Sequence, residues 1–279
     1  MGTIVGVPSV AQVGDATVIA ALSSDNSLQF WWQPIGSQGW NPEQVAGPGT
    51  TSSFPSVAQV GNSTVIAAQG FDDASLLFYW QPIGSQGWSP EQVAGPGTTA
   101  AAPSVAQVGD STVIVAQGPE HRLVLYWQPI GAEQWNAEQV AGPGTTGSYS
   151  VAQVGDATVI AAGDLDGSLL FYWQPIGSQE WNVQLVAGPR TVVPVSVAQV
   201  GNATVIAAVS PVGGLVLYWQ LIGSQQWNTE QVAVPGSTVS ASVAQVGDST
   251  VIAAVDLDGN LLFYWQPIGS QQWNLEQVT

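Results

Sequence analysis

The hydrophobic positions of the chain fall into short runs that end at glycine, proline or acidic turn residues. Residues 150 to 186 show the pattern, with runs at Ser150 to Val154, Thr158 to Ala162, Leu169 to Gln174 and Trp181 to Val186. Runs of this length between turn formers are typical of β-strands, and no stretch keeps the 3.6-residue period of a helix. The pattern therefore predicts four short antiparallel strands in this part of the chain.

The third run alternates regularly. A strand over these residues places Leu169, Phe171 and Trp173 on one face and Tyr172 on the other, and Pro175 ends it because proline cannot donate to a ladder. We interpret this strand tryptophan mainly as a core residue, and expect the tyrosine on the opposite face to line a cleft. The strand tryptophan recurs in every copy of the pattern, as Trp32, Trp80, Trp127, Trp173, Trp219 and Trp265.

The four-run pattern occurs six times, with copies that start near residues 9, 56, 104, 150, 196 and 242. The copies are 46 to 48 residues apart. Four strands in a repeat of this length are the signature of a propeller blade. We therefore predict an all-β protein, a six-bladed β-propeller with four antiparallel strands per blade, and one domain over residues 1–279. The small-residue first strand should lie innermost, where blades crowd.

A second tryptophan follows the polar hairpin after the third strand of every copy. An aromatic ring held beside amide and carboxylate groups suits the apolar face of a sugar ring, whose hydroxyls the polar groups can bind. The alternative is that this tryptophan is a packing wedge between neighbouring blades. The candidate sugar-binding residues are the hairpin tryptophans Trp40, Trp88, Trp135, Trp181, Trp227 and Trp273, with Asn41, Asn136, Asn182, Asn228, Asn274, Glu43, Glu91, Glu138, Glu230, Glu276, Tyr79, Tyr126, Tyr172, Tyr218 and Tyr264.

The composition of the chain limits the functions that we expect. The chain has 2 Lys and Arg against 19 Asp and Glu, a formal charge of −17, which would repel a phosphate backbone and makes nucleic acid an unexpected partner. It has no cysteine and one histidine, His121, so we expect no metal site, no cofactor and no Ser-His-Asp triad. Six like copies of a glutamate do not provide the two unlike carboxylates of a glycosidase. We expect no catalytic residue.

No basic start followed by an apolar run precedes the first copy, and no uncharged run is long enough to span a bilayer. We therefore expect a soluble protein without membrane insertion. Whether it is secreted or cytoplasmic stays open, as does its oligomeric state.

The repeat resembles the propeller lectins, in particular the bacterial and fungal fucose-binding and tectonin-type propellers of the PLL-like group. The residues that carry the resemblance are Asp166-Gly167-Ser168-Leu169, Tyr172-Trp173-Gln174 and Gln179-Glu180-Trp181. The resemblance implies several shallow sugar sites in clefts between adjacent blades, lined by tryptophan, without catalysis. Fucose-binding propellers commonly bring an arginine to the sugar, and no arginine repeats here, which argues against fucose. The fourth copy has Val183-Gln184-Leu185 in place of Pro-Glu-Gln, so we expect a weakened site there.

Two hypotheses follow. The first is a multivalent lectin, because repeated weak sites on one scaffold gain avidity for a glycan-covered surface. The second is a structural or protein-interaction propeller, natural or idealised, in which the identity of the copies reflects assembly alone. Exposed hairpin tryptophans would favour the first hypothesis, and tryptophans buried between blades would favour the second.

Overall fold

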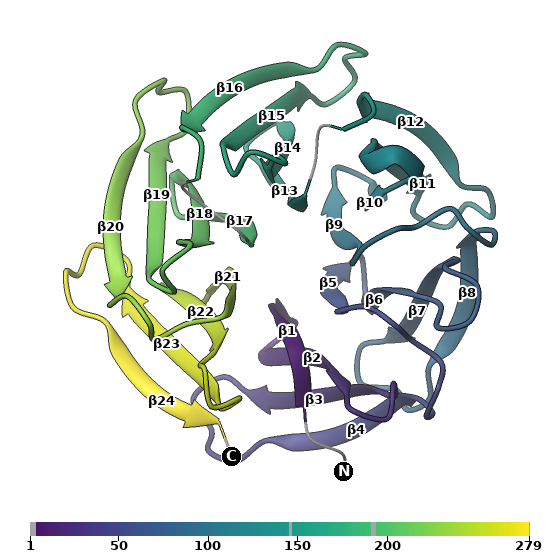
Figure 1. Cartoon of the computed structure of the whole chain (residues 1–279). Helices are drawn as coiled ribbons and strands as arrows, with labels where there is room; N and C mark the ends of the chain where they lie inside the picture. The colour runs from purple at the N-terminus through teal and green to yellow at the C-terminus, as the bar shows by residue number, and fades with distance from the viewer. Residues whose placement is uncertain (1–3, 145–146, 191–193, 279) are drawn as a thin grey trace. The chain divides into compact units, whose positions relative to one another are not determined.

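The computed structural model describes residues 4–144, 147–190 and 194–278. It contains six four-stranded antiparallel sheets, the blades of a six-bladed β-propeller (Figure 1). This confirms the fold class predicted from the repeats. We number the blades 1 to 6 in chain order.

The chain divides into two compact units, Met1–Thr145 and Thr146–Thr279. The first unit holds blades 1 to 3, formed by β1 (Ile4–Val13), β2 (Ala16–Ser23), β3 (Leu28–Pro34), β4 (Asn41–Ala46), β5 (Ser56–Val60), β6 (Ser63–Gln69), β7 (Leu76–Pro82), β8 (Ser89–Ala94), β9 (Ser104–Val108), β10 (Ser111–Gln117), β11 (Leu123–Pro129) and β12 (Asn136–Ala141). The second unit holds blades 4 to 6, formed by β13 (Ser148–Val154), β14 (Ala157–Gly163), β15 (Leu169–Pro175), β16 (Asn182–Ala187), β17 (Val195–Val200), β18 (Ala203–Val209), β19 (Leu215–Leu221), β20 (Asn228–Ala233), β21 (Ser240–Val246), β22 (Ser249–Val255), β23 (Leu261–Pro267) and β24 (Asn274–Val278).

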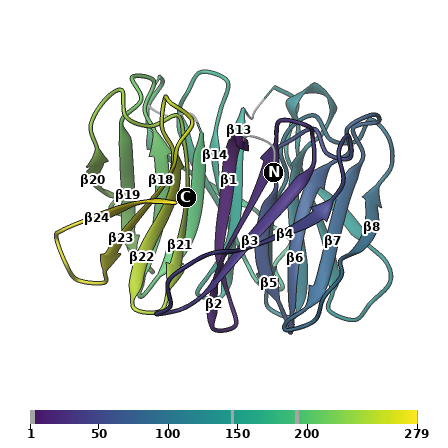
Figure 2. The ribbon, with the colours of Figure 1, turned by 90° about the horizontal axis from the view of Figure 1, so that it is seen from below.

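Each blade is a simple meander in which consecutive strands pair, as the side-by-side strands β5 to β8 illustrate (Figure 2). A Gly-Asp or Gly-Asn turn joins the first two strands. Gly155 has a φ of +55° in this turn, a backbone conformation that residues other than glycine rarely adopt. The fourth strand begins one residue later than predicted, at Asn182, so the hairpin tryptophan Trp181 precedes the strand and is not part of it.

The hydrophobic core lies between neighbouring blades. In the second unit, Leu169 and Phe171 of β15 pack with Ile206 of β18 and Tyr218 of β19, and Trp173 lies at the margin of the same cluster. The predicted face of Leu169, Phe171 and Trp173 is thus confirmed, and it points toward the next blade. Equivalent clusters join blades 1 and 2, 2 and 3, and 5 and 6.

The repeated SVAQVG phrase supplies hydrogen bonds between first strands. The Ser196 hydroxyl oxygen accepts from Val243 N at 3.0 Å, and Gln245 Oε1 accepts from Gly201 N at 2.7 Å. Within each unit these first strands lie side by side, as β1, β5 and β9 do. Ser9, Ser56 and Ser150 make the same contact, as do Gln59, Gln107 and Gln199.

The helical structure within the described residues is one 3-10 turn, η1 (Pro119–His121), in the connection that interrupts the repeat of blade 3. No helix in that part of the chain has the length and apolar character needed to cross a membrane.

Candidate functional site: the clefts between neighbouring blades

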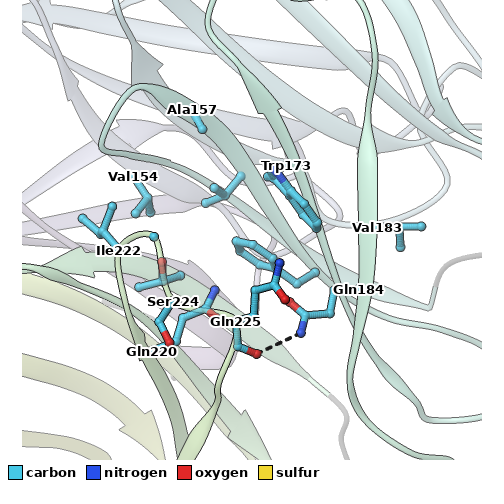
Figure 3. A pocket seen from close by; sticks show the side chains of 13 residues that line it. Val154, Ala157, Trp173, Val183, Gln184, Gln220, Ile222, Ser224 and Gln225 are labelled. Carbon is cyan, nitrogen blue, oxygen red and sulfur yellow. Dashed lines mark hydrogen bonds between the residues drawn. The ribbon is translucent and has the colours of Figure 1, made fainter.

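A cleft of about 500 Å³ opens between blades 4 and 5 (Figure 3). Its blade 4 wall includes Trp173 of β15 and Gln184 of β16, and its blade 5 wall includes Gln220 of β19 and the hairpin residues Ile222 and Gln225. We call this the blade 4/5 cleft. It combines an indole ring with three side-chain amides, and none of its lining residues is ionisable.

The strand tryptophan is the aromatic residue that faces this cleft, whereas the sequence interpretation placed it mainly in the core. Trp173 lines the cleft and stacks on Phe171, with ring centroids 5.7 Å apart and planes at 21°. The core interpretation is wrong for Trp32 and Trp80, which are 39% and 38% exposed. These residues stand near the end of the third strand, beyond the part of the blade that the next blade covers. Trp127, Trp219 and Trp265 are half-buried.

The hairpin tryptophans are half-buried, and the rings of Trp88, Trp135 and Trp227 meet the preceding blade. Trp227 packs edge-on against Phe171 at 5.3 Å and 72°, and Trp88 packs against Phe30 with the same distance and angle. Trp135 contacts Phe78 at 5.5 Å and 73°. This geometry is that of the packing wedge, and each of these rings fixes one hairpin against its neighbour. Trp40, Trp181 and Trp273 are half-buried as well.

The repeated glutamate accepts the indole N–H of the next blade. Trp88 Nε1 donates to Glu43 Oε1 at 3.1 Å, and Gln81 Nε2 donates to the same oxygen at 3.3 Å. The sequence analysis proposed both residue types but did not pair a glutamate of one copy with the tryptophan of the next. The glutamates and the hairpin tryptophans recur at equal intervals along the chain, and this equal spacing could have indicated the pairing. The same bond joins Trp135 to Glu91 at 2.9 Å and Trp273 to Glu230 at 3.1 Å.

The remaining carboxylates of this series differ in exposure: Glu138 is half-buried and Glu276 is exposed. The asparagines at the start of the fourth strand close the hairpin of their own blade. Asn228 Nδ2, for example, donates to the backbone oxygen of Trp219 at 3.4 Å. Asn41, Asn136, Asn182 and Asn274 do the same with the strand tryptophan of their blades.

The tyrosines lie deeper than the expectation that they line a cleft. Tyr79, Tyr172, Tyr218 and Tyr264 are buried, and Tyr126 is half-buried. Tyr218 belongs to the core cluster between blades 4 and 5. Burial raises the pKa of these hydroxyls above its ordinary value, as at Tyr79 and Tyr218. Packing against the preceding blade draws Tyr79, Tyr218 and Tyr264 into the core, and Gln220, two residues after Tyr218, reaches the blade 4/5 cleft instead.

No cluster of three or more His, Cys, Asp or Glu side chains that could hold a metal ion occurs within the described ranges. His121 lies exposed in η1, and the neighbouring Arg122 pairs with Glu120 at 2.8 Å. The chemistry that the clefts offer is therefore hydrogen bonding by amides and stacking on an indole.

Several solved structures with a similar fold are those of lectins. The BP39L lectin from Burkholderia pseudomallei aligns over 100% of this chain and 83% of its own, with a TM-score of 0.75 and 20% identity. The fold is that of the lectin propellers. A fungal lectin from Aleuria aurantia, described as a six-bladed β-propeller with a novel fucose recognition mode, aligns over 100% of this chain and 97% of its own, with a TM-score of 0.75 and 11% identity.

The SapL1 lectin in complex with α-methyl fucoside aligns over 99% of this chain and 97% of its own, with a TM-score of 0.78 and 11% identity. No protein-family model and no curated protein sequence matches the chain. The likeness therefore lies in the fold and not in shared sequence.

Proposed function

We propose that this protein is a multivalent carbohydrate-binding protein whose sites are the clefts between neighbouring blades. The observation that carries the proposal is the blade 4/5 cleft, where Trp173 stands beside the amides of Gln184, Gln220 and Gln225. An aromatic wall with a few convergent polar groups suits a sugar ring, which is apolar on one face and carries hydroxyls at its edge. The structural neighbours, which include a lectin crystallised with a fucoside, support this assignment.

The two tryptophans of a blade have different roles in the proposed site. Phe171 covers one face of Trp173, and we assign the other face to the sugar. Trp227 fixes the hairpin that carries Gln225 by packing on Phe171. Because the layout repeats, the same protein offers several such clefts, and weak sites on one scaffold add up to avidity on a glycan-covered surface.

The charge of −17 favours neutral glycans over sulfated or carboxylated ones. We infer no catalytic role, since cleavage of a glycosidic bond uses two carboxyl groups at a defined separation. Three of the described interfaces between blades contain the repeated glutamate. In each of them it is a single carboxylate that accepts a hydrogen bond from an indole N–H. A glycosidase reaction has no second acid or base there.

The test is a glycan array with the intact protein, followed by titration of each hit while tryptophan fluorescence is monitored. Trp173→Ala and Trp32→Ala should each remove one stacking surface and weaken binding at their site by about threefold to tenfold. Leu221→Ala is the matched control, because Leu221 is 52% exposed and does not line the cleft. A folded protein that binds no glycan on the array would overturn the proposal.

A protein-interaction scaffold is the second candidate. The observation that favours it is the outer strand β16 of blade 4, where Val183 and Leu185 are 57% and 59% exposed and Leu185 replaces the glutamine of the other five copies. If the array is negative and the fold intact, a protein partner for this strand is the next hypothesis to examine.

A further inference from the structure

Four interfaces between neighbouring blades lie within the two units, and one of them differs at the residue that meets the hairpin tryptophan of the following blade. Between blades 1 and 2, 2 and 3, and 5 and 6, the outer strand carries a glutamate that accepts the indole N–H of the following hairpin tryptophan. Between blades 4 and 5, Gln184 takes the place of that glutamate.

The sheet pairing and the aromatic contact at Gln184 match those at Glu43. Gln184 pairs with Phe171 in the sheet, as Glu43 pairs with Phe30. The ring contacts of these two phenylalanines with Trp227 and Trp88 are equal, at 5.3 Å and 72°. The backbone and the aromatic rings therefore place position 184 where a carboxylate would reach the indole, and the difference is one of side-chain chemistry.

The exchange of carboxylate for amide leaves two buried atoms without a protein partner. Gln184 Nε2 donates instead to the backbone oxygen of Gln225 at 3.2 Å (Figure 3). Neither Trp227 Nε1 nor Gln220 Oε1 has a hydrogen-bond partner among the described residues. Gln220 is 6% exposed and its side chain lines the cleft, so a buried acceptor faces the cleft.

The counterparts of Gln220 and Trp227 between blades 1 and 2 are Gln81 and Trp88, and both of these donate to one oxygen, Glu43 Oε1. From this equivalence we infer that a single group can reach both Gln220 and Trp227.

Buried polar atoms are rarely left unpaired, because the loss of their hydrogen bonds to water is then uncompensated. A hydroxyl group both donates and accepts, so one hydroxyl can serve Gln220 Oε1 and Trp227 Nε1 together. Gln184 is held by one exposed hydrogen bond and can turn aside for a ligand.

We propose that the blade 4/5 cleft is a site distinct from its glutamate-bearing counterparts, one that takes a hydroxyl of a neutral sugar between Trp227 Nε1 and Gln220 Oε1. The proposal rests on the function proposed above in that the hydroxyl is taken to belong to a glycan. It reverses the expectation of a weakened site in the fourth copy. In the other three interfaces the carboxylate already occupies the indole N–H, so a ligand would have to compete with it.

The test uses two matched variants. Gln184→Glu introduces the repeated glutamate and should block the hydroxyl position at Trp227 in the blade 4/5 cleft, whereas Glu43→Gln should free the equivalent position at Trp88 between blades 1 and 2. The indole N–H signals are followed by ¹H–¹⁵N NMR on the whole chain, with Trp227→Phe and Trp88→Phe used to assign them. The probes are the methyl glycosides of fucose, galactose and mannose.

We expect a glycoside that binds to shift the Trp227 signal in the unmodified protein. Gln184→Glu should weaken that response by about tenfold or more, the value of one charge-assisted hydrogen bond that the sugar must displace. Glu43→Gln should give Trp88 a response that it otherwise lacks. Binding that shifts other indole signals and leaves Trp227 unmoved would overturn the inference while the lectin function stands.

Solvent exchange of the indole N–H tests the inference without a sugar. Trp227 should exchange faster than Trp88, whose N–H is held by a carboxylate, and Gln184→Glu should remove the difference. Faster exchange at Trp227 supports the unpaired site even if none of the glycosides binds, in which case the lectin function is what fails. Equal exchange at the two tryptophans overturns the inference, because the indole of Trp227 would then have a partner.

Discussion

The inner and outer halves of each blade use their repeated residues differently. In the inner half, formed by the first two strands, side chains are buried and the repeated serine and glutamine bind the backbone of an adjacent blade. In the outer half, the end of the third strand, the hairpin and the fourth strand carry exposed and half-buried groups that meet in a cleft. Repetition in the inner half has a structural cause, so evidence on function must come from the outer half.

The largest contrast should appear in stability. Ile206 of β18 is fully buried in the core between blades, and Ile206→Ala should destabilise the fold by about 2–5 kcal/mol, the cost of a large-to-small change in a core. Leu185→Ala removes a side chain of similar size that is 59% exposed, and should change stability by less than about 0.5 kcal/mol. Urea unfolding of both variants provides the measurement. If the two variants lose the same free energy of unfolding, the distinction between the inner and outer halves is wrong.

The second prediction concerns the polar link of the outer half. Glu230→Ala removes the acceptor of Trp273 Nε1, now at 3.1 Å, and should cost about 1–3 kcal/mol because a half-buried donor loses its partner. Gln184→Ala is the control, since Gln184 makes no bond to Trp227 and its bond to Gln225 is exposed. We expect a change within about 0.5 kcal/mol for the control. If both variants unfold at the same urea concentration, the glutamate does not stabilise the interface.

These contrasts also show what the sequence could predict. Six copies of a four-run pattern sufficed for the blades and their strands, because strand periodicity and turn chemistry are local properties. The orientation of Trp173 was predictable from alternation, but its exposure was not, because exposure depends on how far the next blade extends along the strand. The burial of Tyr218 was not predicted because it depends on packing against the preceding blade, which is another copy of the repeat. The bond between Glu43 and Trp88 joins two copies, and a pattern within one copy does not contain it.

The third prediction concerns the inner hydrogen bonds. Ser196→Ala removes the hydroxyl that accepts from Val243 N at 3.0 Å in a buried position, and should cost about 0.5–1.5 kcal/mol, the net value of one such bond. Ser224→Ala removes an exposed hydroxyl in the hairpin of blade 5, where the bond to Gln226 N competes with water. Its effect on the urea midpoint should be smaller. A larger effect of the hairpin serine would mean that the outer half also depends on its side-chain bonds for stability.

The smallest effects should come from two turns between the second and third strands, which join the inner to the outer half. Hydrogen bonds from Ser27 hold the pKa of the Asp25 carboxyl below its ordinary value of 3.8. Partial burial and the neighbouring Asp166 raise the pKa of Asp164 above the same value. Asp25 therefore contributes stability that is present above its unfolded pKa and is lost as the pH falls through its folded pKa. Asp164 acts in the opposite sense, and its contribution is lost as the pH rises through its folded pKa.

Carboxyl ¹³C NMR between pH 2 and pH 6 should accordingly show Asp25 titrating below Asp164. Ser27→Ala should move the Asp25 midpoint upward, because the hydroxyl hydrogen bond is the largest cause of its lowered pKa. Asp166→Asn should move the Asp164 midpoint downward, because it removes the carboxylate that accepts a hydrogen bond from protonated Asp164 and, to a smaller extent, a like charge. Asp25 occupies the turn position of Asp166, because Ser27 and Ser168 donate to these two carboxylates in the same way. Asp164 instead begins its turn. The opposite shifts of Asp25 and Asp164 therefore follow from the different positions and partners of the two carboxyls. A reversed order of the two midpoints would contradict this assignment.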